Sequence, residues 1–350
     1  MKQDIKSMSL EELGEYFESI GERRFRAEQV FRWLHGSALS FGGMTNLPES
    51  LRSKLDEQFC LTGPELLKKR VSRLDGTTKY LWGMRGGDAV ESVVMEYEHG
   101  STVCISSQVG CRMGCAFCAS AIGGFVRNLT ASEMLDQVMY SQLDAGKRLS
   151  NVVLMGIGEP LDNFHNVVRF LELITHPLGM NIGARHISLS TCGIAEKIDK
   201  LAQYDIQLTL TVSLHAPDDE TRSLLMPVNR VGGVDKLLEA CARYFAKTGR
   251  RVSYEYALID GVNDTARHAG LLARKLKNSG CHLNIIPLSD VPELPLRGSG
   301  YEKVKTFYGL LREKGVNCTI RRSLGGDISA SCGQLRRAET CRGGNLPPAG

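Results

Sequence analysis

The chain of 350 residues lacks the segments that mark secreted and membrane proteins. Its first residues, Met-Lys-Gln-Asp-Ile-Lys-Ser, contain no apolar signal-peptide core, and no apolar run of about 18 residues occurs anywhere. The 11 cysteines are too few for a disulfide scaffold. We therefore expect a cytoplasmic protein with reduced thiols, in which clustered cysteines bind a metal or take part in catalysis.

The chain also lacks a strong excess of either charge, since 43 basic and 39 acidic residues leave a net charge of +4. That whole excess lies in residues 312–350, and four arginines there fit a phosphate-binding rim: Arg321, Arg322, Arg336 and Arg337. The tail 337–350 is polar and contains Gly and Pro, so we expect it to be disordered. Because apolar residues make up 42% of the chain, disorder throughout is excluded.

Residues 1–90 predict a small helical accessory module. Ser9 and Glu12 have the spacing of a capping box, and helical patterns follow at 13–20, 27–34 and 48–59. Short strands are expected at 79–84 and 91–97. Arg23, Arg24 and Arg26 lie among aromatic residues, but a solvated amphipathic helix explains them better than a nucleic-acid surface.

Residues 91–336 predict an α/β domain of six β-then-α units. The expected strands are 102–106, 151–155, 186–190, 207–214, 251–258 and 282–287. The helices that follow them are expected at 130–145, 167–175, 194–203, 234–246, 265–277 and 302–314. This alternation predicts a partial (β/α)6 barrel whose strands end at the active mouth, with an open doubly wound sheet as the alternative. A strand at 317–321 and a Gly-rich loop form a C-terminal extension.

Three cysteines follow the first barrel strand in the run Cys111-Arg-Met-Gly-Cys115-Ala-Phe-Cys118. Three thiolates suit a four-iron cluster with one iron left open, whereas a structural zinc site needs four ligands. Gly110 and Gly114 allow the loop to curl. Cys104 could complete a zinc knuckle instead, but zinc motifs usually contain two closely spaced pairs. We favour the iron–sulfur cluster.

Polar motifs end the next three strands. The run Met155-Gly-Ile-Gly-Glu-Pro160 lacks the third glycine of a dinucleotide fingerprint. The carboxylate of Glu159 would attract an ammonium, and Gly158 allows the backbone to approach it. Ser190 and the run Ser213-Leu214-His215 offer polar groups to a nucleoside, although each alone is more often a strand-end cap.

Cys332 lies in the Gly-rich segment 324–335, where flanking arginines favour the nucleophilic thiolate. An inert buried cysteine is the alternative, and it is our interpretation of the cysteines outside these motifs.

The CxxxCxxC run is similar to that of radical S-adenosylmethionine (SAM) enzymes. The full set of motifs resembles the RlmN/Cfr family of RNA adenine methyltransferases, over essentially the whole chain. The further segments that carry the resemblance are Cys104-Ile-Ser-Ser-Gln-Val-Gly-Cys111, Gly-Phe-Val-Arg127-Asn-Leu-Thr130, Leu225-Met-Pro-Val-Asn229, Gly261-Val-Asn-Asp264 and Ala330-Ser-Cys332-Gly-Gln-Leu.

The resemblance implies a [4Fe-4S] cluster on the three clustered cysteines and two SAM molecules per turnover. It makes Cys332 the methyl carrier, Cys104 the thiol that resolves it as a Cys104–Cys332 disulfide, and Glu91 the proton acceptor. The implied cofactor contacts are Gly158, Glu159, Ser190, Ser213, Leu214 and His215. The family usually has an Asn followed by Pro after the last barrel strand, whereas this sequence has Ile286-Pro-Leu-Ser289-Asp. We assign the cofactor contact of that Asn to Ser289, whose side chain is shorter.

The resemblance further implies an RNA substrate (23S rRNA and also tRNA), an RNA-binding N-terminal module and an electron donor of the flavodoxin or ferredoxin type. It implies a monomer without membrane attachment. Methylation at adenine carbon 2 is favoured over carbon 8, for which the sequence holds no cue. The alternatives are a radical enzyme acting on a small molecule or peptide, and a zinc-knuckle RNA-binding module.

Overall fold

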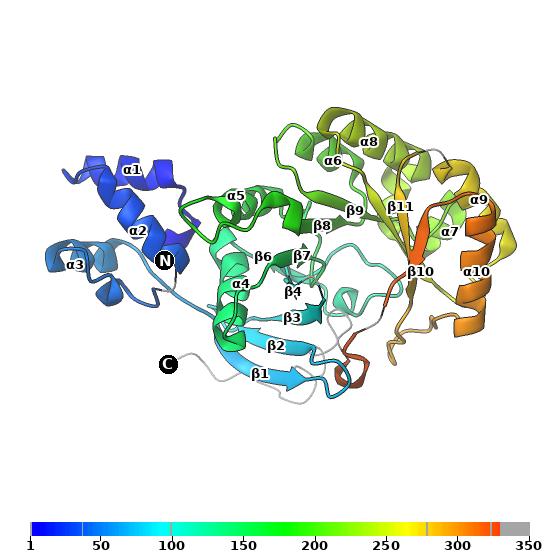
Figure 1. Ribbon diagram of the computed structural model, residues 1–350, viewed down its shortest axis with the longest axis horizontal. Coiled ribbons are helices and arrows are strands. Elements are labelled where there is room, and N and C mark those ends of the chain that lie inside the picture. The colour runs from blue at the N-terminus through cyan, green and yellow to red at the C-terminus, as the bar shows by residue number, and fades with distance from the viewer. Residues whose placement is uncertain (1, 37, 99, 278, 323, 330–350) are drawn as a thin grey trace.

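The computed structural model describes residues 2–329 except 37, 99, 278 and 323. It consists of a small group of N-terminal helices beside a large, strongly curved sheet that is covered by further helices (Figure 1). Within this described part, no helix is both long enough and apolar enough to cross a membrane.

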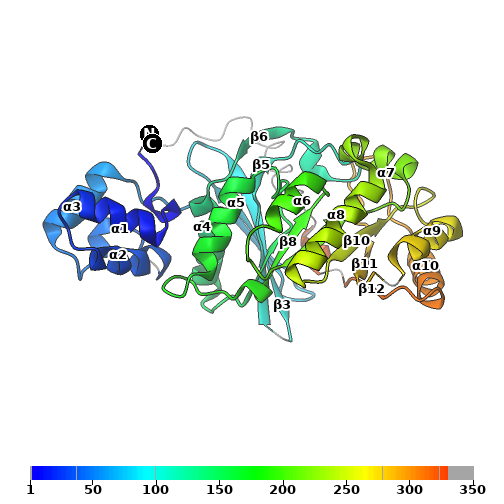
Figure 2. The same cartoon turned by 90° about the horizontal axis from the view of Figure 1, so that it is seen from above.

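The N-terminal helices are α1 (Leu10–Ser19), α2 (Phe25–Gly36) and α3 (Glu49–Gln58), which confirms the three helices predicted there. The capping box is present, because the backbone N–H of Glu12 donates to Ser9 Oγ (3.1 Å) while the N–H of Ser9 donates to the Glu12 carboxylate (2.7 Å). Figure 2 shows this group at one end of the molecule, next to α4 and α5.

A buried ion pair ties the N-terminal helices to the barrel. The Lys6 ammonium lies 2.6 Å from the carboxylate of Asp136 on α4 (Ala131–Ala145), and both side chains are almost fully buried. At the surface, Arg169 of α5 (Phe164–Thr175) pairs with Glu12 at 2.7 Å. Together these contacts fix the module on the outer face of two barrel helices.

Ten strands form one sheet, in the order β1-β2-β3-β4-β7-β8-β9-β10-β11-β12. Their bounds are Glu65–Val71, Thr78–Gly83, Ala89–Tyr97, Gly100–Cys104, Asn151–Leu154, Ile187–Thr191, Thr209–Ser213, Ser253–Leu258, His282–Pro287 and Cys318–Ile320. Strands β1 to β4 pair antiparallel, and from β4 onward every neighbouring pair is parallel. The two outermost strands of this order do not pair with each other, so the barrel is partial, as predicted.

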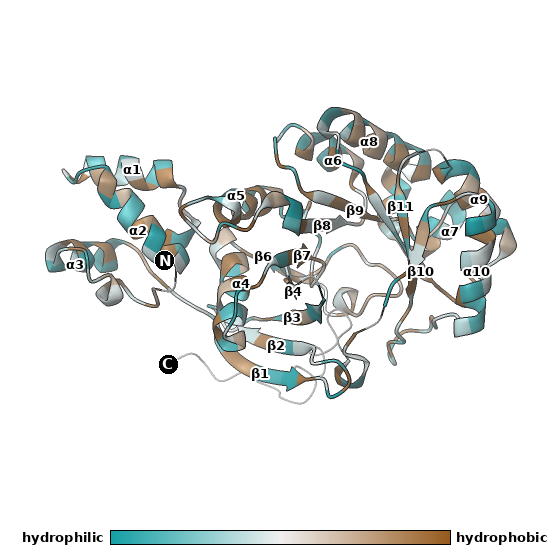
Figure 3. Ribbon diagram, viewed as in Figure 1, coloured by the Kyte–Doolittle hydropathy of each residue, from teal (hydrophilic) through white to brown (hydrophobic). Residues whose placement is uncertain are grey.

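Helices follow the parallel strands, as the six-unit pattern predicted. Besides α4 and α5 they are α6 (Ala195–Leu201), α8 (Gly233–Thr248), α9 (Ala266–Leu276) and α10 (Tyr301–Glu313). Figure 3 shows hydrophobic and hydrophilic stretches on the same helices, as expected where one face packs against a sheet. Because successive strands run the same way, their C-terminal ends meet at one edge of the sheet.

Four α-helices and strands of the described chain, β1, β5 (Gln108–Gly110), β6 (Phe125–Asn128) and α7 (Asp219–Leu225), were not predicted from the sequence. Strand β1 is an exposed edge strand without a regular alternation of apolar residues. The short hairpin of β5 and β6 flanks the cysteine loop, and α7 has only seven residues. The sheet continues across residue 90, because β3 begins at Ala89, so the division of the chain at that position stays a prediction.

Candidate active site

One cavity of about 400 Å³ lies at the C-terminal ends of the parallel strands. It is lined by almost all the residues that the sequence singled out: Glu91, Cys104, Cys111, Cys115, Cys118, Gly158, Glu159, Ser190, Ser213, His215 and Ser289. Leu214 is buried in the hydrophobic core next to this lining. Cys332 and the arginines at 336 and 337 lie outside the described residues.

The cysteine loop leaves the sheet through β5 and returns through β6. Gly110 has a φ of +74°, and a Cβ there would lie 1.8 Å from the carbonyl oxygen of Gly124, so only glycine fits. The N–H of Cys111 donates to that same carbonyl (3.0 Å), and the N–H of Ala116 donates to the carbonyl oxygen of Leu225 (2.9 Å). The first bond joins the two ends of the loop, and the second attaches its middle to the end of α7.

The three thiols of this loop are close enough to influence one another. Burial raises the pKa of Cys111 to about 11, and the neighbouring thiol of Cys118 adds to the rise. Burial also raises the pKa of Cys115, with contributions from Cys118 and Cys111. Binding to iron would remove this penalty on the thiolates, since the cation offsets their negative charge.

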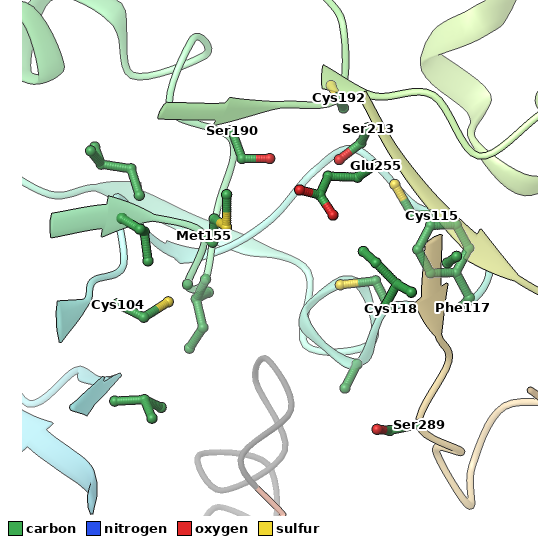
Figure 4. Close-up of a pocket in the computed structure, with 18 of the residues that line it drawn as sticks. Cys104, Cys115, Phe117, Cys118, Met155, Ser190, Cys192, Ser213, Glu255 and Ser289 are labelled. Atoms are coloured by element: carbon green, nitrogen blue, oxygen red, sulfur yellow. The ribbon is translucent and has the colours of Figure 1, made fainter. Parts of the chain in front are cut away.

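Within the described residues, no set of three or more His, Cys, Asp or Glu side chains is arranged to hold a single metal ion. A four-iron cluster makes a different demand, because each of its thiolates binds a separate iron. Figure 4 shows Cys115 and Cys118 on one side of the cavity and Cys104 on the other. This separation disfavours the zinc knuckle with Cys104, and the three-thiol loop beside an open cavity fits a cluster with one free iron.

Glu159 connects the ends of β7 and β8. Its buried carboxylate accepts hydrogen bonds from the hydroxyl of Thr191 (2.7 Å) and from the backbone N–H groups of Cys192 (2.7 Å) and Leu161 (3.0 Å). Burial nevertheless raises the pKa of Glu159. A Cβ at Gly158 would lie 2.6 Å from Gln108, so glycine is required just before this carboxylate.

His215 ends the segment after β9 with a φ of +54°. Its Nδ1 accepts a hydrogen bond from the N–H of Ala257 (2.9 Å), which leaves Nε2 as the donor in the neutral ring. Burial, with a smaller contribution from Arg222, lowers the pKa of His215 to about 3. The imidazole is therefore neutral near pH 7 and can donate one hydrogen bond into the cavity that it lines.

Cys104, Glu91 and Lys79 lie on three neighbouring strands. Val93 of β3 pairs with Lys79 of β2 and with Cys104 of β4, so these three side chains lie on one face of the sheet. Glu91 precedes Val93 by two positions on β3, so its side chain lies on the same face. The Lys79 ammonium lies 3.4 Å from the carboxylate of Glu91, and both side chains are buried. Burial raises the pKa of Cys104 to about 11.

Two structurally important residues were missed from the sequence. Lys79 was interpreted only as part of a strand, because the pairing with Glu91 depends on the register between β2 and β3. Arg222 of α7 is buried and donates to the carbonyls of Leu214 (3.0 Å), Ser213 (3.1 Å) and Cys192 (2.6 Å) and to the Asn229 side chain (2.8 Å). Arg222 precedes the motif Leu225-Met-Pro-Val-Asn229 by three residues. This proximity to a motif was the signal in the sequence that could have identified it.

The segments at and after the ends of β11 and β12 also line the cavity. Ser289 lies just past β11 and lines the cavity (Figure 4), and its contact with a cofactor stays a prediction. Arg321, after β12, lies 3.4 Å from the buried carboxylate of Glu255 on β10. Arg321 and Arg322 both line the cavity, so at least half of the predicted arginine rim reaches the site.

The amino-acid sequence matches two known family descriptions. Residues 3–61 match the ribosomal RNA large subunit methyltransferase N-terminal domain, and residues 105–273 match the radical SAM superfamily. The chain is 48% identical over 335 residues to a protein of Thermoanaerobacter sp. (strain X514) that is named a probable dual-specificity RNA methyltransferase RlmN. That match covers 95% of this chain and 98% of the relative.

A protein of the same name from Lachnoclostridium phytofermentans is 49% identical over 340 residues, covering 97% of this chain and 96% of the relative. Among solved structures, a radical SAM methyltransferase from Sphaerobacter thermophilus superposes with a TM-score of 0.90 at 43% identity. It covers 95% of this chain and 98% of its own. The similarity therefore extends over the N-terminal helices, the partial barrel and the cysteine loop together.

Proposed function

The chain belongs to the RlmN family of radical SAM methyltransferases, and we propose that it methylates carbon 2 of an adenine in 23S rRNA and in tRNA. The observation that carries this proposal is the gathering of the three-cysteine loop, Cys104 and Glu91 around one cavity. The relatives' name, dual-specificity RNA methyltransferase, supports two RNA substrates and favours carbon 2 over carbon 8.

Cys111, Cys115 and Cys118 would hold the cluster, which together with SAM supplies a methyl donor and, after one-electron cleavage, a hydrogen-abstracting radical. Gly158 and Glu159 would face the amino group of SAM. Ser190, Ser213 and His215 would bind the nucleoside part, and Ser289 would add a contact from β11. The neutral His215 suits this task, since it offers one donor without adding charge beside a sulfonium.

Cys332 would accept the methyl group as a thiolate and carry it to the RNA. The target ring carbon is electron-poor, so direct polar transfer from a sulfonium is unfavourable, and a covalent tether between Cys332 and the base avoids it. Glu91 would take the proton that leaves the ring carbon. The Cys104 thiolate would then attack the Cys332 sulfur, so that a disulfide forms as the bond between Cys332 and the transferred carbon breaks. That carbon would take up one proton and become the methyl group of the released adenine.

The position of the cavity also indicates how the target adenine must be presented by the RNA. An adenine inside a stacked helix cannot reach a site at the ends of barrel strands, so the base must be unstacked or flipped out. Arg321 and Arg322 at the cavity wall would lie near the backbone of such an extruded nucleotide. The N-terminal helices, held to α4 by Lys6 and Asp136, would bind flanking RNA.

Anaerobic turnover with two cysteine variants tests this proposal. Cys332→Ala should abolish methylation of rRNA, and Cys104→Ala should accumulate a covalent RNA–protein adduct. Cys60→Ala is the matched control, because Cys60 lies beside the N-terminal segment and its sulfur contacts Arg85 (2.8 Å) and not the cavity. Normal turnover of Cys332→Ala, at an iron content equal to that of the wild type, would exclude Cys332 as the methyl carrier.

A further inference from the structure

The turn between β1 and β2 is hydrogen-bonded to residues 325–329, about 250 positions later in the chain. The N–H of Gly325 donates to the carboxylate of Asp75 (2.7 Å). The hydroxyl of Ser72 and the N–H of Arg73 both donate to the carboxylate of Asp327, at 2.6 and 2.9 Å. Two carboxylates, one from each segment, thus close a reciprocal clasp.

Both carboxylates of this clasp are held in the ionised form. Burial alone would raise the pKa of Asp75, but backbone hydrogen bonds from Gly325 and Thr77 hold it down to about 2. The Ser72 hydroxyl, followed by the Arg73 N–H, lowers the pKa of Asp327. Hydrogen bonds to a charged acceptor are stronger than neutral ones, which favours a lasting contact between the two segments.

A third contact carries the clasped segment to the cavity. The Lys79 ammonium donates to the carbonyl oxygen of Ser329 (2.7 Å) and also pairs with Glu91. Lys79 and Cys104 are each paired with Val93, so Ser329 is held within a few strand widths of Cys104. Cys332 follows Ser329 by three residues, which span at most about 11 Å.

We propose that Asp75 and Asp327 are positioning residues that anchor the chain before Cys332 to the β1–β2 turn, and so raise the effective concentration of the Cys332 thiol at Cys104. This inference rests on the proposed pairing of these two thiols. Among the described residues, neither aspartate lines the cavity. Their effect is to shorten the free chain that has to be ordered when the two sulfurs meet.

The equilibrium of the Cys104–Cys332 disulfide with glutathione measures that effective concentration. Oxidised glutathione takes two electrons from the two thiols, so one protein disulfide and two reduced glutathione molecules form. The holoenzyme is equilibrated anaerobically in buffers of different glutathione ratio, alkylated, and quantified by peptide mass spectrometry. Iron content and Tm are recorded in parallel, because a merely structural defect would alter those instead.

Asp75→Ala and Asp327→Ala should each lower the effective concentration about tenfold, the effect of losing hydrogen bonds to a charged acceptor. Asp327→Asn keeps an acceptor oxygen and should recover part of the loss. The matched control is Glu98→Ala, which removes an exposed carboxylate near the β3–β4 turn of the same sheet. In this control the effective concentration of the Cys332 thiol at Cys104 should equal that in the wild type.

Two outcomes contradict the inference in distinguishable ways. If the wild type and both alanine variants give the same effective concentration, the clasp does not position Cys332. If the wild type forms no Cys104–Cys332 disulfide at any glutathione ratio, the proposed thiol pair itself is wrong, and the inference is overturned together with it.

Discussion

Lys79 and Glu91 form a buried ion pair, with the ammonium nitrogen 3.4 Å from a carboxylate oxygen. Removing one member of such a pair leaves a buried charge without its partner, at a cost of about 3–5 kcal/mol. We therefore expect Lys79→Met to lower the free energy of unfolding by about that amount. Urea denaturation at pH 7 measures it.

A double variant provides the control for this pair. Adding Glu91→Gln to Lys79→Met removes the remaining charge, so the double variant should be more stable than Lys79→Met alone. If adding Glu91→Gln lowers the free energy of unfolding further, the loss of stability in Lys79→Met does not come from an unpaired Glu91 charge, and the ion-pair explanation is wrong.

Cys104 should limit product release at neutral pH. Burial raises the pKa of its thiol to about 11, so only a small fraction is thiolate at pH 7. Because the thiolate is the attacking species, the single-turnover release rate should rise nearly tenfold per pH unit between about pH 7 and pH 9. A release rate that is constant over this range would show that Cys104 is already ionised or does not attack.

Arg222 should stabilise the backbone at the ends of β8 and β9. Arg222→Met would leave three backbone carbonyls and the Asn229 side chain without their donor, and each unsatisfied buried group costs about 1–3 kcal/mol. We expect the free energy of unfolding to fall by about 3 kcal/mol or more. The exposed Arg230→Met is the control, and equal stability of the two variants would contradict the assigned role.

His35 of α2 should make stability depend on pH. Burial lowers its pKa to about 3, whereas in the unfolded chain it titrates near 6.5. Between these values only the unfolded chain binds the proton, so stability falls as pH decreases below about 6.5, by about 1.4 kcal/mol per unit.

Urea denaturation at pH 7 and pH 5.5 tests this dependence. His35→Phe should lose less stability than the wild type over that interval, whereas the exposed His165→Phe should behave like the wild type. An unchanged pH dependence in His35→Phe would mean that its imidazole is not buried in the neutral form.

The partial barrel and much of the cavity lining could be predicted from sequence because each motif ends a strand, and parallel strands end at one edge. Ser190, Ser213 and Glu159 reached the cavity for that reason. Contacts that depend on register or on distant segments could not be predicted in this way. Lys79 meets Glu91 only through the antiparallel pairing of β2 with β3, and the clasp of Asp75 with Gly325 joins residues 250 positions apart.

The most direct test of the proposed function is the isotopic content of the transferred methyl group. SAM carrying a fully deuterated methyl group is supplied to the enzyme with unmodified rRNA under anaerobic conditions, and the nucleosides are analysed by mass spectrometry. Transfer through S-methylcysteine 332 with hydrogen abstraction predicts 2-methyladenosine in which one of the methyl deuteriums has been replaced by hydrogen. Retention of all the methyl deuteriums, or 8-methyladenosine as the product, would contradict the account.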